Sequence, residues 1–164
     1  MSYSLGARSL AFCKHVDPKL ITAIQHALSI STQDAGLAAE QSRTQAEEDA
    51  LVAKGVSHTH HSHHIIDCKP GWAAPGYSGA VDLVPWDGKK FVWDFKMIFP
   101  LVAAMKQASI DLSTPITWGG VWDRLLTEYT KSPEEEMNAY IARQRAAGNA
   151  HPFVDGPHFE LGRN

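Results

Sequence analysis

The hydrophobic positions in the first third of the chain recur at helical spacing in two segments. In the first segment, Asp17 and Pro18 supply an N-cap residue and a proline at the first helical position. The apolar residues that follow lie on one stripe: Leu20, Ile21, Ile24, Ala27 and Leu28. This spacing predicts a helix whose stripe packs against a core.

The second helical segment begins at Thr44. Thr44 and Glu47 have the spacing of a capping box, in which each side chain hydrogen-bonds the backbone N–H group of the other residue. Leu51 and Val52 are expected to form the apolar face of this helix, and Gly55 is placed to end it.

The middle of the chain changes to the pattern of β-strands. Residues 80–84 form an apolar run interrupted only by Asp82, which predicts a buried strand. Asp87 and Gly88 then predict a turn, after which residues 91–93 are expected to return as a partner strand. A further helix is expected over about 98–112, with Pro100 in its first turn or at a kink.

The last third of the chain combines two short strands with one helix. Residues 116–118 and 158–161 are short apolar runs that predict strands. Between them, Ser132 and Pro133 start a helix, and the glutamates at 134–136 suit the positive end of its dipole. Helices that flank a small antiparallel sheet constitute an α+β fold.

Composition places the chain among folded proteins of one domain. It has 164 residues, of which 44 % are hydrophobic and 20 % charged. Lys and Arg number 15 against 18 Asp and Glu, so the net charge of −3 provides no basic excess for binding nucleic acid or an anionic membrane. Because neither a signal core nor a long apolar run is visible, we expect synthesis in a cytoplasm. Cys13 and Cys68 are not expected to form a disulfide there.

One count is unusual, because five of the nine His lie between His58 and His64. Imidazole is a common ligand for zinc. The tract by itself also allows loose metal binding without function, a solvated loop, or histidines that hydrogen-bond their neighbours. A catalytic zinc site needs three protein ligands, an open position for water and a carboxylate base.

Asp82, Asp155 and His158 have the chemistry to complete such a site. Asp82 lies in an apolar strand, where an unpaired carboxylate would be costly to bury, although an edge strand could turn it to solvent. Asp155 and His158 flank a Gly-Pro pair that forces a tight turn, so both side chains can point at one place. Their ordinary interpretation is a turn-capping Asp and a half-buried His.

Taken in order, these residues resemble the signature of the zinc peptidases related to VanY and VanX, in particular the bacteriophage endolysins that act as L-alanyl-D-glutamate peptidases. The motifs are Ser62-x-His64, Ala80-x-Asp82 and Asp155-x-x-His158, with Arg43 upstream. The resemblance extends from about residue 7 to the end of the chain. It implies a fold like that of Hedgehog and the D-Ala-D-Ala peptidases, with residues 1–164 as one domain. Two segments look inserted, a loop at about 65–79 and a helical segment at about 123–152.

The resemblance also assigns roles to individual residues. It implies one zinc ion per chain, with the ligands His64, Asp82 and His158. Asp155 would be the general base that takes a proton from water and passes it to the leaving amine. Arg43 would stabilise the oxyanion or hold the substrate carbonyl, and Ser62 would support the ligands or contact a substrate carboxylate.

Two alternatives for the ligand set stay open. His63 is the rival of His64, because a slip of one residue on a strand turns the side chain to the opposite face. The Ser62-x-His64 register favours His64. Cys68 as a ligand would make a softer site. The remaining members of the tract are expected to be bystanders or weak ligands at the rim: His58, His60 and His61.

The expected function is hydrolysis of the L-Ala–D-Glu bond in the peptide stem of peptidoglycan during host lysis. One rival keeps the metal site but is a D-Ala-D-Ala carboxypeptidase or dipeptidase, which would release D-Ala. A second is a zinc-binding module without catalysis, which predicts a missing base or arginine, whereas Asp155 and Arg43 are both present. A third is a His-rich storage or sensing protein, which predicts several weakly bound ions per chain.

The resemblance further implies a monomer whose partner is the peptide stem, with neither nucleic acid nor a stable membrane association. The enzyme would be made in the host cytoplasm without a signal peptide. It would act on the cell wall after release through a holin-type pore.

Overall fold

An antiparallel sheet of five strands lies at the centre of the fold, in the order β1-β2-β5-β3-β4. The computed structural model describes residues 2–67 and 69–162. Within them the strands are β1 (Ala35–Leu37), β2 (Ala80–Pro85), β3 (Ile116–Trp118), β4 (Val121–Leu125) and β5 (His158–Leu161). Together with the helices around it, this sheet confirms the expected α+β class.

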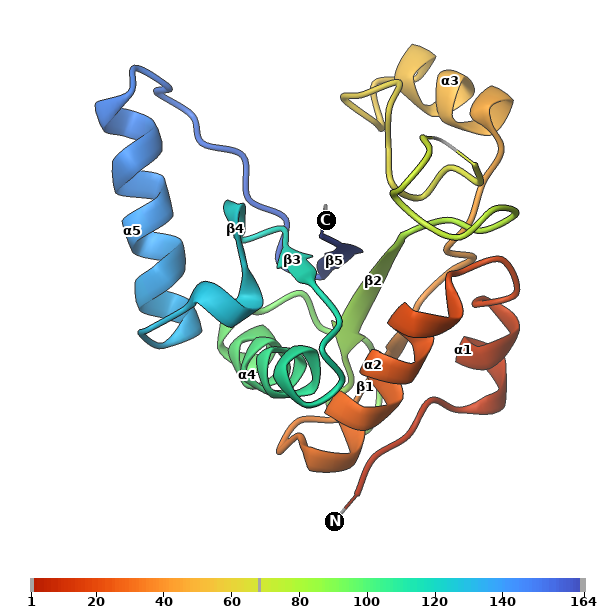
Figure 1. Ribbon diagram of the computed structural model, residues 1–164, viewed down its shortest axis with the longest axis horizontal. Helices are drawn as coiled ribbons and strands as arrows, with labels where there is room; N and C mark the ends of the chain where they lie inside the picture. Colours follow the sequence, from red (N-terminus) through yellow and green to blue (C-terminus); the bar gives the residue numbers. More distant parts are fainter. Residues whose placement is uncertain (1, 68, 163–164) are drawn as a thin grey trace.

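The helices come from all parts of the chain. They are α1 (Ala7–Ala11), α2 (Pro18–Ile30), α3 (Gln45–Ala53), α4 (Phe95–Asp111), the short 3₁₀ helix η1 (Leu126–Glu128) and α5 (Pro133–Ala146). Figure 1 places α3 and α5 on opposite sides of the molecule, with β2 and β5 between them. Among the described residues, none of these helices has the length and apolarity needed to cross a membrane.

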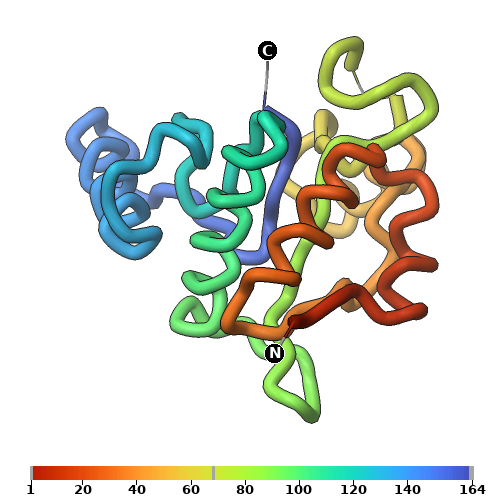
Figure 2. Tube along the Cα trace, turned by 60° about the horizontal axis from the view of Figure 1, so that its bottom comes forward, coloured from red at the N-terminus to blue at the C-terminus, as the bar shows by residue number. Residues whose placement is uncertain are grey.

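The main core lies between the sheet and a layer formed by α2 and α4, which pack side by side (Figure 2). Both helices and the central strands contribute side chains that are almost completely buried: Leu20, Ile24, Leu101, Met105, Trp118 and Phe159. Each large apolar side chain buried in this way contributes about 1.5–3 kcal/mol to folding. The opposite faces of β2 and β5 are thereby left available for polar residues.

The predicted helix starts are confirmed by their hydrogen bonds. The Asp17 side chain accepts from the backbone N–H of Lys19 at 2.9 Å, and Pro18 is the first residue of α2. Complete capping boxes begin α3 at Thr44 and α5 at Ser132. Gly55, which follows α3, has a φ of +70°, a left-handed conformation that glycine adopts without strain.

Helix α4 differs from its prediction at its start. It begins at Phe95, where the Asp94 side chain accepts from the N–H of Lys96 at 2.9 Å. Pro100 therefore lies in the second turn and inside the helix, not in the first turn. Proline has no N–H group to donate to the carbonyl of Lys96, so this turn has one backbone hydrogen bond fewer.

The strand predicted at residues 91–93 is wrong. After the turn at Asp87 and Gly88, the chain makes one isolated bridge between Trp86 and Phe91 and then leaves the sheet. Strand β1 pairs with residues 83–85 of β2 and β5 pairs with residues 80–82, on the opposite edge. The returning chain therefore makes a single backbone hydrogen bond to the end of β2, from the N–H of Val92 to the carbonyl of Pro85 at 2.9 Å, and then enters α4 at Phe95 instead of continuing as a strand.

Four elements were not predicted from the pattern: α1, β1, β4 and the short helix η1. Strand β1 has only three residues, and β4 overlaps the start of the segment at 123–152 that was expected to be helical. Helix α5 accounts for the later part of that segment. It is joined to β4 by Arg143, whose guanidinium donates to both carboxylate oxygens of Asp123 at 2.9–3.2 Å.

Candidate metal centre

Strand pairing places Asp82 and His158 next to each other. Asp82 of β2 is directly opposite His158 of β5 in the antiparallel register, so the two side chains lie on the same face of the sheet. Their strand neighbours Val81 and Phe159 are fully buried on the other face, in the core. The alternation of a strand thus holds both polar residues on the face opposite the apolar layer.

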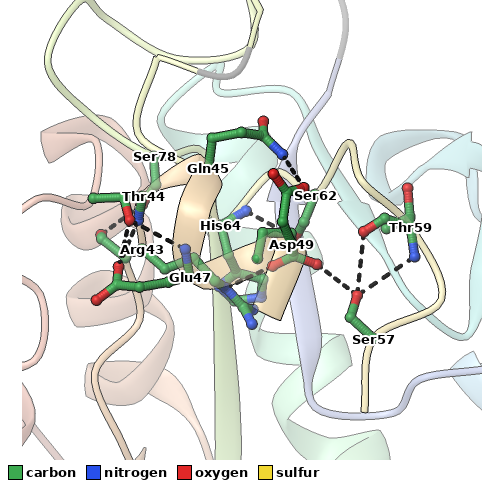
Figure 3. A network of polar contacts seen from close by, with 12 residues as sticks. Arg43, Thr44, Gln45, Glu47, Asp49, Ser57, Thr59, Ser62, His64 and Ser78 are labelled. Carbon is green, nitrogen blue, oxygen red and sulfur yellow. Dashed lines mark hydrogen bonds and ion pairs between the residues drawn. The ribbon is translucent and has the colours of Figure 1, made fainter. Parts of the chain in front are cut away.

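His64 reaches the same place from a loop. The backbone of its segment runs beside that of Arg43, because the N–H of Arg43 donates to the carbonyl of His64 at 3.0 Å. The hydroxyl of Ser62 accepts from the N–H of His64 at 3.2 Å, which closes a short turn. Figure 3 shows Arg43, Ser62 and His64 gathered beside α3.

The three side chains present their donor atoms at the spacing that a small metal ion requires. His64 Nε2 lies 3.3 Å from His158 Nδ1, and each of these atoms lies 3.4 Å from Asp82 Oδ1. Tetrahedral ligands at about 2.0–2.1 Å from zinc lie about 3.3–3.4 Å apart. Asp82 Oδ1 is buried without a hydrogen-bond partner, although the Asp82 side chain as a whole is 43 % exposed. Two imidazoles and one carboxylate with this geometry fit a zinc ion.

Each imidazole is oriented by a hydrogen bond from its other nitrogen. His64 Nδ1 is 2.7 Å from the carbonyl of Gln41, which can only accept, so Nε2 keeps its lone pair for a metal. His158 Nε2 lies 2.9 Å from the carboxylate of Glu160, which leaves Nδ1 for the same purpose. Such outer partners fix the tautomer and raise the basicity of metal-binding histidines.

Gln41 and Glu160 are functional residues that the sequence analysis did not identify. The Gln41 side chain is buried, and its Oε1 accepts from the backbone N–H of Asp82 at 2.6 Å. Gln41 therefore connects the loop that carries His64 to the strand that carries Asp82. Glu160 could have been found, because residues i and i+2 of a strand share a face. No sequence signal marked Gln41.

The electrostatics of the cluster couple its protonation to metal binding. Burial opposes ionisation of Asp82, but the imidazoles of His158 and His64 outweigh burial and hold its pKa below the usual range. Burial also opposes protonation of His158, but Asp82 and Glu160 outweigh it and raise the pKa of His158 to about 9. A metal ion that binds here at neutral pH must displace the proton of His158.

Asp155 lies beside the three donors, on the turn that precedes β5. Its N–H donates to the carbonyl of Gly119 at 2.8 Å, and the indole of Trp118 donates to the carbonyl of Gly156 at 2.6 Å. A Cβ atom on Gly119 would lie 2.4 Å from the carbonyl oxygen of Asp155, so this close approach requires glycine. Burial and the charge of Asp82 raise the pKa of Asp155, which makes its carboxylate a better proton acceptor.

Arg43 is held at the site by a buried carboxylate. Its Nε lies 3.1 Å from Oε2 of Glu48, and the Ser57 hydroxyl donates to the other carboxylate oxygen at 2.5 Å. Glu48, not Leu51 or Val52, is the fully buried residue of α3, which corrects the expected apolar face. The helix packs through an ion pair because its inward side meets the guanidinium of Arg43.

Two cavities meet at His64 and Asp82, two of the three donors, while His158 lines only the second of them. The first, here called the Trp93 cavity, has a volume of about 670 Å³ and extends along α3 to Trp93. The second, the Phe153 cavity, has a volume of about 630 Å³ and extends to Trp122 and Phe153. The residues that line both cavities are Arg43, His64, Asp82 and Asp155. The junction is therefore the place where a long substrate could pass the metal centre.

The sequence matches the family described as "Phage L-alanyl-D-glutamate peptidase" over residues 1–162. The chain belongs to this family. The fold is similar to the crystal structure of the Serratia marcescens L-Ala D-Glu endopeptidase ChiX, with a TM-score of 0.63 and 23 % sequence identity. That similarity covers 95 % of this chain and 87 % of the other. A comparison with curated protein sequences found no match.

In this phage peptidase, the structure brings together all the residues that the motifs selected. His64, Asp82 and His158 form the group of three possible metal ligands that converges within the described residues. Asp155 and Arg43 line both cavities at that group, and Ser62 lines the Phe153 cavity. The enzyme is thus a peptidase with a possible metal site, as the family and the geometry together require.

The rival ligand His63 turns away from the three donors of the peptidase. Its ring is buried and stacks on Trp72 at 3.6 Å between centroids, and its Nε2 lies 3.6 Å from Glu160. This contact ties the loop at 65–79 to the carboxylate that orients His158. Cys68, the other rival ligand, lies outside the described residues. The prediction that it forms no disulfide with Cys13 therefore stays a prediction.

Proposed function

We propose that this peptidase is a zinc-dependent endopeptidase that hydrolyses the L-alanyl-D-glutamate bond in the peptide stem of peptidoglycan. The convergence of His64, Asp82 and His158 at tetrahedral spacing carries the proposal. The family supplies the reaction, because its members are L-alanyl-D-glutamate peptidases. The donor set, two nitrogens and one oxygen, is typical of catalytic zinc with a position open for water.

Zinc bound by these three residues would polarise the scissile carbonyl and lower the pKa of water to about 7. Asp155 accepts a proton from the attacking water and passes it to the nitrogen of the leaving D-glutamate, so the C–N bond breaks as the new C–O bond forms. Its raised pKa suits a group that must first accept and then donate this proton.

Arg43 stabilises the negative charge that develops on the carbonyl oxygen. Its guanidinium is half-buried and is held by Glu48, so it does not have to reorganise as the charge forms. Ser62 has a structural part in the site, since its hydroxyl accepts from the backbone of His64, and we assign it a contact to the substrate as well.

The remaining features of the proposal follow the family. The enzyme acts as a monomer in one domain, in which the loop at 65–79 and the segment at 123–152 are insertions around the site. It is released to the cell wall through a holin-type pore and then degrades peptidoglycan during host lysis.

Digestion of purified peptidoglycan tests the scissile bond. We expect new amino ends that belong to D-glutamate, identified by labelling of the amino ends and mass spectrometry. Release of free D-alanine without new D-glutamate ends would instead identify a D-Ala-D-Ala carboxypeptidase.

The substitution Asp155→Asn tests the assigned base. Activity should fall by about 10²–10⁴-fold, because an amide cannot accept the proton. Zinc content should stay at one ion per chain, since Asp155 is outside the donor group. The matched control is Glu134→Gln on the exposed first turn of α5, which should change neither quantity. Full activity of Asp155→Asn would exclude this residue as the base.

A further inference from the structure

The metal centre lies at the junction of two cavities that differ in chemistry. Arg43, His64, Asp82 and Asp155 line both cavities, so a bond that reacts between them leaves one end of the substrate in each. The chemistry of the two cavity walls therefore indicates which end of the substrate lies in which cavity. This inference rests on the proposed function, because it takes the peptide stem as substrate.

The two ends of the substrate also differ in chemistry. On the amine side, D-glutamate carries a free α-carboxylate next to the scissile nitrogen, and a diamino acid with further charges follows. On the acyl side, L-alanine is joined through a lactyl group to neutral amino sugars. An acidic peptide must therefore be recognised on one side of the metal, and a neutral glycan on the other.

The wall of the Phe153 cavity is suited to carboxylates. Beyond the metal centre its ionisable residues include His58 and His61, which are both exposed. The carboxylate of Glu160 in the same wall is engaged by His158, and that of Asp82 belongs to the metal donors. Imidazoles can donate hydrogen bonds to a substrate carboxylate without competition from these acids.

Local contacts position both residues at the rim, through the backbone of His61 and the ring of His58. The N–H of His61 donates to the Thr59 hydroxyl at 3.0 Å, and the ring of His58 meets the edge of Phe153 with centroids 6.5 Å apart. Asp49, the nearby acid that His61 influences electrostatically, is bound to His60 at 2.8 Å.

The wall of the Trp93 cavity is suited to a neutral glycan. Its own charged residues are Glu40, Glu47 and Lys54, and the Glu47 carboxylate is engaged by the N–H and hydroxyl of Thr44. Apart from the shared residues, Lys54 is thus the one cationic or imidazole group that the described residues of this wall offer to an acidic peptide. Trp93 is 64 % exposed and supplies a flat aromatic surface. The apolar faces of sugar rings pack on such surfaces, which also keep their indole N–H available for polar contacts.

We propose that the acidic peptide on the amine side lies in the Phe153 cavity, where His58 and His61 contact its carboxylates, and that the glycan on the acyl side packs on Trp93. His58 and His61, two members of the His tract that the metal does not use, thus form a recognition site for the leaving peptide. His60, which lines neither cavity, has no part in it.

Kinetics on matched substrates test each half of this direction separately. The substrates are a disaccharide-linked stem and the free stem peptide, each with the glutamate α-carboxylate or with its α-amide. His58→Gln together with His61→Gln should lower the preference for carboxylate over amide by about tenfold and leave the preference for the disaccharide unchanged. Trp93→Ala should lower the preference for the disaccharide by about fivefold and leave the preference for carboxylate over amide unchanged. His60→Gln is the control and should change neither preference.

Binding of the two product fragments gives a readout without turnover. The disaccharide linked to L-alanine should change the fluorescence of wild-type protein, and Trp93→Ala should remove that change. The acidic peptide product, measured by calorimetry, should lose affinity only in the double His variant.

Three results would decide against the proposed direction. Loss of the disaccharide preference in Phe153→Ala but not in Trp93→Ala would reverse it. The proposed direction would be contradicted if both preferences stayed unchanged in all variants. It would also be contradicted if His58 and His61 bound metal while both preferences stayed unchanged. A wild-type protein that cleaves no L-Ala–D-Glu bond in any of the four substrates would instead contradict the proposed function itself.

Discussion

The three candidate ligands come from two regions of unlike construction. Asp82 and His158 face each other across paired strands, and the core behind those strands fixes where they lie. His64 lies in a loop without regular structure, and it is held by separate contacts to Gln41, Ser62 and Arg43. The sheet positions two donors through the backbone, whereas the loop positions the third through side-chain and carbonyl contacts. The loop ligand is therefore expected to be the more easily displaced.

Loss of a sheet ligand should have the largest effect. In His158→Ala we expect no tight zinc and no measurable activity, because two donors cannot hold the ion and Asp82 loses its partner. His64→Ala should lose zinc as well, but its metal-free form should melt closer to the wild type, since His64 lies outside the sheet. Metal analysis and thermal melting with and without zinc measure both effects. One tightly bound zinc in His158→Ala would contradict the ligand assignment.

The outer partners should have intermediate effects and separate the two regions. Glu160→Gln weakens the support of His158, and Gln41→Leu removes the connection between the loop and Asp82. Each should lower zinc affinity by about 10–100-fold in competition with a chelator. Gln41→Leu should also increase hydrogen exchange around His64, whereas Glu160→Gln should not. Equal exchange in the two variants would mean that loop and sheet are equally rigid.

The pH dependence of stability in the metal-free protein reports on His158, the histidine of strand β5. The pKa of His158 is raised from 6.5 to about 9, so its interactions stabilise the fold fully below pH 6.5, and this stability is lost as pH rises through 9. Zinc affinity should change in the opposite direction and increase by about tenfold per pH unit until pH reaches that pKa. Denaturant unfolding and chelator titrations between pH 6 and 10 check both slopes. A zinc affinity that is flat over this range would show that His158 binds zinc without losing a proton.

The cap of α3 should have the smallest effect and only on the loop side. Thr44→Ala removes the capping box and should lower the free energy of unfolding by about 1 kcal/mol. Zinc affinity should stay unchanged, because Glu48 and Arg43 remain paired in the folded state. Ser132→Ala, the matched change at the capping box of α5, provides the control for a cap far from the site.

Local signals explain which elements were predictable. Caps at Asp17, Thr44 and Ser132 act within four residues, so the sequence marks them directly. The short strand β1 has no such signal, because it exists only where β2 offers an edge. The strand expected at 91–93 is wrong because the N-cap of α4 at Asp94 follows immediately, after a single bond from Val92 to Pro85.

The candidate site divides in the same way. The motif residues His64, Asp82, Asp155 and His158 could be selected from the sequence, because their types and spacing carry chemistry. Their convergence could not be read from spacing alone, since it depends on the register between β2 and β5. Gln41 left no signal, because its role consists of contacts to residues distant in the chain.

The sequence by itself determined the helix boundaries set by caps, the α+β class and the types of residue that could bind a metal. The tertiary structure decided that His64 joins Asp82 and His158 while His63 turns to Trp72 and Glu160. It also divided the cleft into two cavities of different character. The physical reason is that caps and periodicity depend on neighbours in the chain, whereas a metal centre and its cleft depend on which distant segments the core and the strand pairing bring together.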